Sequence, residues 1–330
     1  MTGLEDHDFD EALSRRELEN FIPDRIFDAH AHLYRRDFFR GSVPDLVTKY
    51  PKMGLDQFRH SIGKIIPNRH IRGGLFFGWP DPEIDIEANN DFVRDQVEHD
   101  PSSRAQMLIT PEMDPEFVRE RVKRDGFSGL KCYHVYAGKG PTFNATIPSY
   151  LPEAHVRIAH DEGLSITLHM VRPRAIADPE NQGTIRAWAA KYPNARFILA
   201  HAARGFNPYH TIEGIGSLKG LNNIWCDTSA VTEGGAFEAI VRTLGVERLL
   251  YGSDSPVSLI RGRCVAIADS FLWLSEANTT FTVPYGNLHP ALVGFESLRV
   301  LKLACLNLGL SDSQVEKIFW QNAAELYGLE

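Results

Sequence analysis

The sequence predicts an α/β fold, a (β/α)₈ TIM barrel with helical additions at its N-terminal and C-terminal ends, built as one domain over residues 1–330. Three observations predict it. Short apolar runs alternate with longer amphipathic segments along the chain. The length of 330 residues is one that α/β barrels commonly reach as a single domain. The first apolar run ends in histidines and lacks the glycine-rich turn of a dinucleotide-binding sheet.

The short apolar runs have the length and composition of strands that are buried in a parallel sheet. They span residues 25–29, 72–77, 105–110, 129–133, 165–169, 196–201, 223–228 and 248–253. The amphipathic segments predict helices over residues 84–99, 114–125, 151–162 and 182–192. Asp114-Pro115 opens the second of these helices, with the aspartate as N-cap and the proline in the first turn.

A series of strand–helix units fits either a closed barrel or a doubly wound sheet. The number of units favours the barrel, and no G-x-x-x-x-G-K-[ST] motif supports nucleotide binding. Three segments fall outside the minimal barrel, namely a helix around residues 11–20, an insertion over residues 33–69 and the tail 258–330. We expect all three to decorate a single domain.

Composition excludes several partners. The net charge is −8 and no long basic run occurs, which argues against nucleic acid and against an anionic membrane surface. No apolar stretch approaches the length of a membrane span, and the first ten residues lack the apolar core of a signal peptide. The four cysteines form no C-x-x-C pair, which predicts reduced thiols. We therefore expect a cytoplasmic protein, and we leave open whether it forms homo-oligomers.

The first strand ends in two histidines, His30 and His32. Residues two apart on a strand face the same side, so both imidazoles converge at the carboxyl-terminal mouth of the barrel, where barrel active sites lie. A lone H-x-H can equally be a pair of ordinary surface histidines. Further strand ends decide between these interpretations.

Three more predicted strands end in a histidine or an aspartate, at His169, His201 and Asp254. Both residue types are poor strand formers, and packing does not explain their recurrence at strand ends. Imidazole nitrogen and carboxylate oxygen together suit a divalent metal such as zinc. The pattern predicts a catalytic metal centre at the barrel mouth.

With these motifs the sequence resembles the amidohydrolase superfamily, in its amidohydrolase-related branch. The matching segments appear in the family's order, and they are specific only in combination. They are residues 27–32 (FDAHAH), 129–131 (GLK), 168–169 (LH), 199–202 (LAHA), 251–254 (YGSD) and 318–329 (IFWQNAAELYGL). The resemblance implies a barrel and the hydrolysis of C–O or C–N bonds in small molecules. The branch also resembles non-oxidative decarboxylases.

The resemblance also implies roles for individual residues. It makes His30, His32, His169 and Asp254 the ligands of one divalent metal, most simply zinc, with manganese as the main rival. Asp254 would also accept a proton from a metal-activated water. His201 would polarise the substrate or act as a second acid or base.

Lys131 ends the fourth predicted strand. In binuclear relatives a carboxylated lysine at this position bridges two metals, although the branch more usually holds one. The alternative is a lysine that pairs with a substrate carboxylate or with an acid of the barrel.

Three arginines, Arg35, Arg172 and Arg204, each lie three residues beyond a proposed site histidine, and Arg174, Arg261 and Arg263 follow on the same barrel face. Because arginine grips carboxylates through two parallel hydrogen bonds, this arrangement predicts an anionic small-molecule substrate. We expect Arg35, Lys131, Arg172, Arg204 and Arg261 to be the substrate-binding residues. The alternative is that several of them form salt bridges with loop acids. Trp79, Tyr133 and His134 also follow strands, where they could line the pocket or simply pack in loops.

Three functional hypotheses follow. The first is a hydrolase that acts on a small carboxylate-bearing lactone or amide. The second keeps the same site but makes the protein a decarboxylase, and the third is a barrel that binds a ligand without catalysis. Metal analysis separates the third hypothesis from the other two, and detection of released carbon dioxide separates the second from the first.

Overall fold

The computed structural model describes residues 3–66, 68–138, 140–283 and 286–330. Its centre is an eight-stranded sheet in which every pair of neighbouring strands is parallel. In sheet order the strands are β1 (Ile26–His32), β4 (Ile71–Phe77), β5 (Arg104–Leu108), β6 (Gly129–Cys132), β7 (Ser165–Leu168), β8 (Arg196–Leu199), β9 (Ile224–Asp227) and β10 (Leu249–Leu250). Sheet order equals chain order, and the predicted TIM barrel is confirmed.

The barrel closes between its last and first strands. The segment after β10 runs parallel to β1, with Ala31 opposite Ser255. The Ala29 amide donates to the Tyr251 carbonyl at 2.8 Å, and the His32 amide donates to the Ser255 carbonyl at 2.8 Å. These bonds bring the ends of β1 and β10 together. The predicted site residues His30 and His32 therefore lie beside Asp254.

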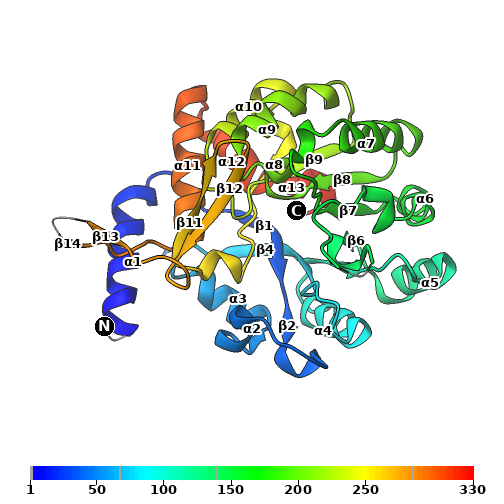
Figure 1. Cartoon of the computed structure of the whole chain (residues 1–330), viewed down its shortest axis with the longest axis horizontal. Helices are drawn as coiled ribbons and strands as arrows, with labels where there is room; N and C mark the ends of the chain where they lie inside the picture. Colours follow the sequence, from blue (N-terminus) through cyan, green and yellow to red (C-terminus); the bar gives the residue numbers. More distant parts are fainter. Residues whose placement is uncertain (1–2, 67, 139, 284–285) are drawn as a thin grey trace.

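Helices cover the outside of the barrel (Figure 1). They are α3 (Leu55–Ile62), α4 (Ile86–Val97), α5 (Pro115–Asp125), α6 (Glu153–Asp161), α7 (Pro179–Lys191), α9 (Pro208–Gly214), α10 (Gly235–Leu244) and α11 (Val293–Leu308). As predicted, Asp114 caps α5 and accepts hydrogen bonds from the Glu116 and Phe117 amides. Helix α7 begins three residues before the predicted start, because Asp178 caps it in the same way ahead of Pro179.

The three predicted decorations are present. The first is α1 (Gly3–Leu18). The insertion over 33–69 holds β2 (Tyr34–Arg35), α2 (Asp45–Lys49), β3 (Lys52–Met53) and α3. The tail holds β11 (Gly262–Ile267), β12 (Ser270–Ser275), β13 (Thr282–Val283), β14 (Gly286–Asn287), α11, α12 (Asp312–Glu316), the π-helical turn η8 (Lys317–Gln321) and α13 (Asn322–Tyr327). The tail is therefore not purely helical, because two antiparallel hairpins precede α11.

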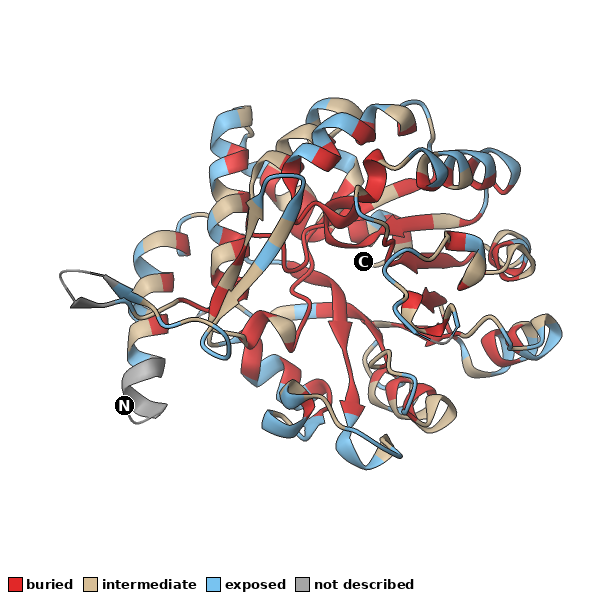
Figure 2. Cartoon of the chain, viewed as in Figure 1, coloured by how far each residue is buried: buried red, intermediate tan, exposed pale blue. Residues whose placement is uncertain are grey.

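Single 3₁₀ turns connect the larger elements. They are η1 (Arg36–Phe38), η2 (His134–Tyr136), η3 (Ile147–Ser149), η4 (Ala175–Ala177), η5 (Ile215–Leu218), η6 (Val246–Arg248) and η7 (Val257–Leu259). Figure 2 shows that the barrel strands are mostly buried, with partly exposed residues at some strand starts, whereas the surrounding helices alternate buried and exposed positions.

The carboxyl-terminal segment closes one end of the barrel. Trp320, Ala323 and Leu326 pack in one buried cluster with Phe27, the second residue of β1, and the side chain of Arg196, the first residue of β8, donates to the Leu326 carbonyl. The strand starts form the amino-terminal end of the barrel, so the carboxyl-terminal end is left for the site.

All four cysteines lie in the described part of the chain, buried and unpaired, as predicted. Among the described residues we find no helix long and apolar enough to cross a membrane.

Candidate metal centre

Three buried side chains meet where β1 and β10 end. The Asp254 carboxylate oxygen Oδ1 lies 3.5 Å from Nε2 of His30 and 3.4 Å from Nε2 of His32. A tetrahedral ion with ligands at about 2.1 Å separates neighbouring ligand atoms by about 3.4 Å. The trio of His30, His32 and Asp254 therefore has both the donor types and the spacing of a divalent metal site.

The other nitrogen of each histidine is held by an acceptor. Nδ1 of His30 lies 2.9 Å from the Asp227 carboxylate, and Nδ1 of His32 lies 3.0 Å from the Gly78 carbonyl oxygen. An acceptor at Nδ1 fixes the proton there and leaves the lone pair on Nε2, which is the tautomer that a metal requires. Both rings thus offer their lone pairs toward Asp254.

Burial and charge set suitable protonation states. Desolvation lowers the pKa of His30 to about 3, with Lys131 adding to the effect, and desolvation also lowers the pKa of His32. Burial alone would raise the pKa of Asp254, but the neighbouring histidines, with His32 foremost, hold that pKa below its ordinary value. Near neutral pH the trio is two neutral imidazoles and one carboxylate.

Asp227, at the end of β9, is a site residue that the sequence analysis missed. It is fully buried, and its two oxygens accept from Nδ1 of His30 and from the His201 and Ser229 amides. Burial would raise the pKa of Asp227, but His30 outweighs it and the pKa falls to about 2. Because its oxygens are already engaged, we interpret the close group of His30, His201 and Asp227 as a hydrogen-bonded network rather than a second metal site. The signal was available, since Asp227 is the last residue but one of a predicted strand.

His201 lies on an unusual turn. The segment α8 (Ala200–Arg204) contains four consecutive residues with positive φ, from 53° to 60° at His201, Ala202, Ala203 and Arg204. A left-handed turn costs roughly 1–2 kcal/mol per residue without glycine, and such strain persists where surrounding contacts enforce it. Both predicted site residues of the segment, His201 and Arg204, line the same cavity.

His169 lies beside His201 rather than within the trio. Its Nδ1 is 3.0 Å from Nε2 of His201, whose own Nδ1 lies 3.0 Å from the Ser229 carbonyl oxygen. That carbonyl places a proton on Nδ1 of His201, so in the neutral pair His169 donates from Nδ1 and keeps its lone pair on Nε2. His169 therefore adopts the same tautomer as His30 and His32. The ligand atoms of His30, His32 and Asp254 all lie within 4.8 Å of one another, and His169 is not part of that group.

Backbone contacts fix Asp254 against β1. Its amide donates to the His30 carbonyl at 2.8 Å, and its own φ is 60°. Asp28 also links the two segments, because one of its oxygens accepts hydrogen bonds from the His30 amide at 3.0 Å and from the Ser253 amide at 2.9 Å. A Cβ at Gly252 would lie 2.9 Å from Cβ of His30, so only glycine allows this approach.

Lys131 is fully buried beneath the trio, with Nζ 3.4 Å from Nε2 of His30 and over the Phe77 ring at 4.2 Å. Desolvation lowers its pKa to about 8, against the opposing effect of Asp227 and Asp254. Lys131 is absent from the described residues that line the cavity, so the structure places it beside His30 rather than on the cavity wall, and its role in substrate binding stays a prediction.

A cavity of about 520 Å³ opens above these residues. This volume lies within the range of small-molecule pockets. His30, His32, His169, His201 and Asp254 all line it. Every predicted metal or catalytic residue thus faces one cavity at the carboxyl-terminal end of the barrel.

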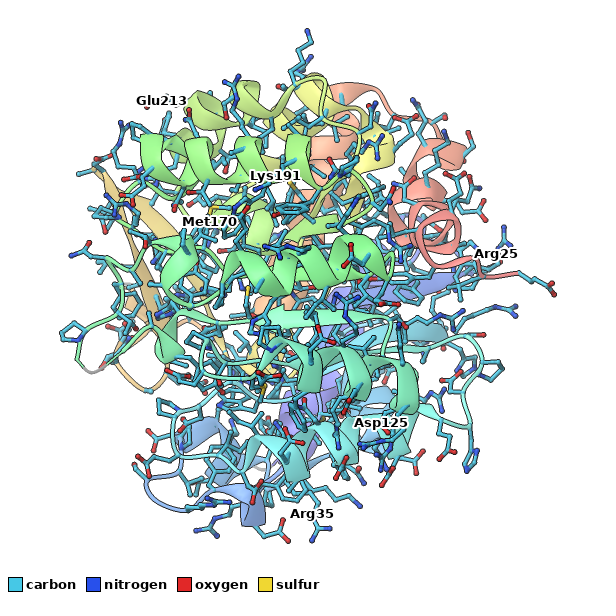
Figure 3. The ribbon with its side chains drawn as sticks, turned by 90° about the vertical axis from the view of Figure 1, so that its right-hand side faces the viewer. Arg25, Arg35, Asp125, Met170, Lys191 and Glu213 are labelled. Atoms are coloured by element: carbon cyan, nitrogen blue, oxygen red, sulfur yellow. The ribbon has the colours of Figure 1, made fainter. Side chains whose placement is uncertain are left out.

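Of the predicted arginines, the structure brings only Arg204 to the described cavity wall. Arg172 pairs with Asp178 and Glu180, and Arg261 pairs with buried Asp10. Arg35 pairs with Asp37 at the surface, and Figure 3 shows it at the edge of the molecule, far from Met170, which follows His169.

The two remaining arginines are also paired with acids. Arg174 contacts Glu213 and Asp269, and Arg263 lies 3.8 Å from Glu296. Arg174 and Arg263, like Arg35, Arg172 and Arg261, therefore form salt bridges with acids of the protein, as the alternative interpretation of the arginines expected.

Arg204 is different. It is only 8% exposed, and no carboxylate among the described residues lies within ion-pair distance of it. One terminal nitrogen donates to the Arg172 carbonyl at 3.0 Å, while Nε has no partner. Desolvation lowers the pKa of Arg204, which reflects a buried cation without a counter-charge.

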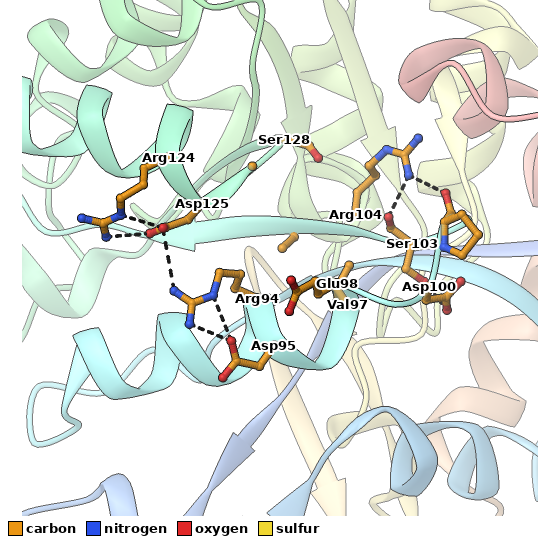
Figure 4. Close-up of a pocket in the computed structure, with 13 residues that line it drawn as sticks. Arg94, Asp95, Val97, Glu98, Asp100, Ser103, Arg104, Arg124, Asp125 and Ser128 are labelled. Atoms are coloured by element: carbon orange, nitrogen blue, oxygen red, sulfur yellow. Dashed lines mark hydrogen bonds and ion pairs between the residues drawn. The ribbon is translucent and has the colours of Figure 1, made fainter.

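A larger cavity of about 700 Å³ lies between α4 and α5 at the opposite, amino-terminal end of the strands (Figure 4). Its arginines are already engaged. Arg94 and Arg124 contact Asp95 and Asp125, and Arg104 donates to backbone carbonyls. Since this end of a barrel serves stability, we assign it no catalytic role.

Comparison with known proteins identifies a family and several solved structures with the same fold. The family model described as amidohydrolase matches residues 27–329, whereas no curated protein sequence gives a significant match. Among solved structures, an amidohydrolase from Burkholderia multivorans with bound zinc aligns with a TM-score of 0.61 and 13% identity, over 92% of this chain and 99% of that chain.

Two further structures share the fold. A protein from Pseudomonas putida named for 2-pyrone-4,6-dicarboxylic acid hydrolysis aligns with a TM-score of 0.59 and 15% identity, over 94% of this chain and 99% of that chain. A dihydroxybenzoic acid decarboxylase from Polaromonas sp. JS666, with bound manganese and 2-nitroresorcinol, aligns with a TM-score of 0.55 and 16% identity, over 93% and 98%. At these identities the likeness shows the fold alone.

Proposed function

The chain belongs to the amidohydrolase family, and from this premise we propose that it is a metal-dependent hydrolase that cleaves a C–O or C–N bond in a small carboxylate-bearing substrate, such as a lactone or an amide. The observation that carries this proposal is the trio of His30, His32 and Asp254, whose imidazole lone pairs are held toward the carboxylate.

The proposed cofactor is one divalent metal, zinc in the first instance, held by His30, His32 and Asp254. We propose His169 as the fourth ligand, because its Nδ1 is held by an acceptor and its Nε2 keeps the lone pair. When bound, the metal supplies Lewis acidity, which lowers the pKa of water and polarises a carbonyl group. Zinc and manganese are each bound by a protein of the same fold.

Asp254 is the proposed proton acceptor. It is ionised at neutral pH and lines the cavity, so it can take a proton from the attacking water and pass it to the leaving group. His201 has both ring nitrogens engaged, by Ser229 and by His169. We propose that His201 acts as a positioning residue that holds the tautomer of His169.

Arg204 is the proposed substrate anchor. A buried guanidinium without an anion is costly, and a substrate carboxylate would offset that cost through charge-assisted hydrogen bonds. The same residue explains why the site would select a substrate that carries a carboxylate.

The test is turnover of a panel of carboxylate-bearing lactones, esters and amides by zinc-loaded protein in ¹⁸O-labelled water. We expect ¹⁸O in the product acid and loss of activity after chelation. Release of carbon dioxide without ¹⁸O incorporation would replace hydrolysis by decarboxylation. The cytoplasmic location stays a prediction, and whether the protein forms homo-oligomers stays open.

A further inference from the structure

Resting on the proposed function, we propose that the substrate is a planar aromatic acid with a single carboxylate, held by Arg204 and by the aromatic face of the β11–β12 hairpin. The hairpin is thus the element that determines substrate specificity, through Phe271 and Trp273.

Aromatic side chains form much of the cavity wall, and they come from different sides of the barrel mouth. Trp79 follows β4, and Tyr133 and Phe143 follow β6. Phe206 follows β8, and Phe271 and Trp273 belong to β12. A wall of ring faces favours a flat ligand that can stack or meet them edge to face.

The β11–β12 hairpin presents one face to the cavity. Phe271 and Trp273 alternate with Leu272 along β12, and their rings lie 5.1 Å and 5.4 Å from the Phe206 ring. Leu272 points the other way and is 52% exposed. Strand alternation therefore supplies both the proposed contacts and a matched control in three consecutive positions.

The tip of the hairpin is fastened to the barrel. The Asn207 side chain donates to the carbonyls of Ala268 and Ser270 at 3.0 Å and 2.9 Å. Nε2 of His210 lies 2.9 Å from the Asp269 carboxylate. These contacts hold Phe271 and Trp273 in place, so the hairpin is a fixed wall and can discriminate between ligand shapes.

The side chains of the cavity wall offer a carboxylate one cationic contact. Arg204 is the one arginine or lysine among the described residues that line the cavity, and its guanidinium lies over the Phe271 ring at 5.2 Å. The cavity also holds an acid outside the metal trio, Asp81, which would repel a second carboxylate. An anion on Arg204 places the ring attached to it beside Phe271.

Binding of inert probes to full-length zinc-loaded protein, measured by calorimetry, tests the proposal without requiring turnover. The probes are benzoate, cyclohexanecarboxylate, isophthalate and benzamide, which differ in planarity or in charge at similar size. We expect benzoate to bind at least tenfold more tightly than each of the others. Equal binding of cyclohexanecarboxylate would overturn the aromatic part, and tighter binding of isophthalate would overturn the single-carboxylate part.

Variants locate the effect. Trp273→Ala and Phe271→Ala should each weaken benzoate binding at least tenfold, while Leu272→Ala should leave it within twofold. If either alanine variant fails to fold, Trp273→Leu or Phe271→Leu replaces it, with the same expected loss. Benzoate binding unchanged in folded, zinc-loaded variants at Phe271 and Trp273 would refute the role of the hairpin. If benzoate selectivity holds while no substrate is hydrolysed, the hydrolase proposal falls and the ligand class stands.

Discussion

Replacing Asp227 by asparagine should weaken metal binding even though Asp227 is not a proposed ligand. Its two oxygens accept from Nδ1 of His30 and from the His201 and Ser229 amides. An asparagine amide has one acceptor oxygen and one donor nitrogen, so one of these donors must face an NH₂ group. The shape of the side chain is otherwise unchanged.

The substitution should weaken metal binding by changing the tautomer of His30. Two backbone amides hold the carbonyl oxygen, which turns the NH₂ group toward His30. The ring can then accept at Nδ1 only by moving its proton to Nε2, the atom that faces Asp254 at 3.5 Å. Loss of such an outer hydrogen bond weakens metal affinity roughly 10–100-fold, which corresponds to about 1.4–2.7 kcal/mol.

The assay is zinc affinity, measured by competition with a chromophoric chelator, with far-ultraviolet circular dichroism as a check of folding. Asp269→Asn is the matched control, because Asp269 also contacts a histidine nitrogen at 2.9 Å, but at the tip of the hairpin. We expect wild-type affinity in the control. Wild-type affinity in folded Asp227→Asn would refute the link between tautomer and metal binding.

Three further predictions concern the site. Asp254→Asn, which is isosteric, should leave the fold intact and lower kcat by roughly 10²–10⁴ or more, and turnover at the wild-type rate would eliminate Asp254 as the base. Arg204→Lys should raise KM by roughly one to two orders of magnitude at unchanged metal content, whereas Arg172→Lys should leave KM unchanged; equal effects of the two would contradict the anchor. Because the pKa of Lys131 falls to about 8 from 10.5, the unfolded chain binds more protons between these pH values, and the metal-free fold should gain up to about 3 kcal/mol as pH rises from 8 to 10.5. Lys131→Met should abolish this gain in denaturant titrations at several pH values, and a variant with the same pH dependence would contradict the assignment.

The barrel could be predicted because its strands are buried on both faces and therefore appear as uninterrupted apolar runs. The residues that end those runs were predictable for a related reason, since histidine and aspartate are out of place in a strand. His30, His32 and Asp254 come together as this pattern implies. Asp227 follows the same pattern and could have been included.

Other features had no local signal. The segment Ala200–Arg204 consists of residues that normally favour a right-handed helix, yet four of its φ angles are positive. The aromatic hairpin is a different case, because its β-branched and aromatic residues favour strands and the expectation of a helical tail overlooked them. The arginines show the limit of positional reasoning, because an acid near each of Arg35, Arg172 and Arg261 decides where the guanidinium points.

The most direct measurement is anomalous diffraction at the zinc edge from crystals of zinc-loaded protein. We expect a single strong peak per chain, about 2.0–2.2 Å from Nε2 of His30, Nε2 of His32 and a carboxylate oxygen of Asp254. The peak should disappear in His32→Ala, and its distance from His169 decides whether that residue is the fourth ligand. A peak bound elsewhere in the molecule, or one that survives in His32→Ala, would contradict the proposed metal centre.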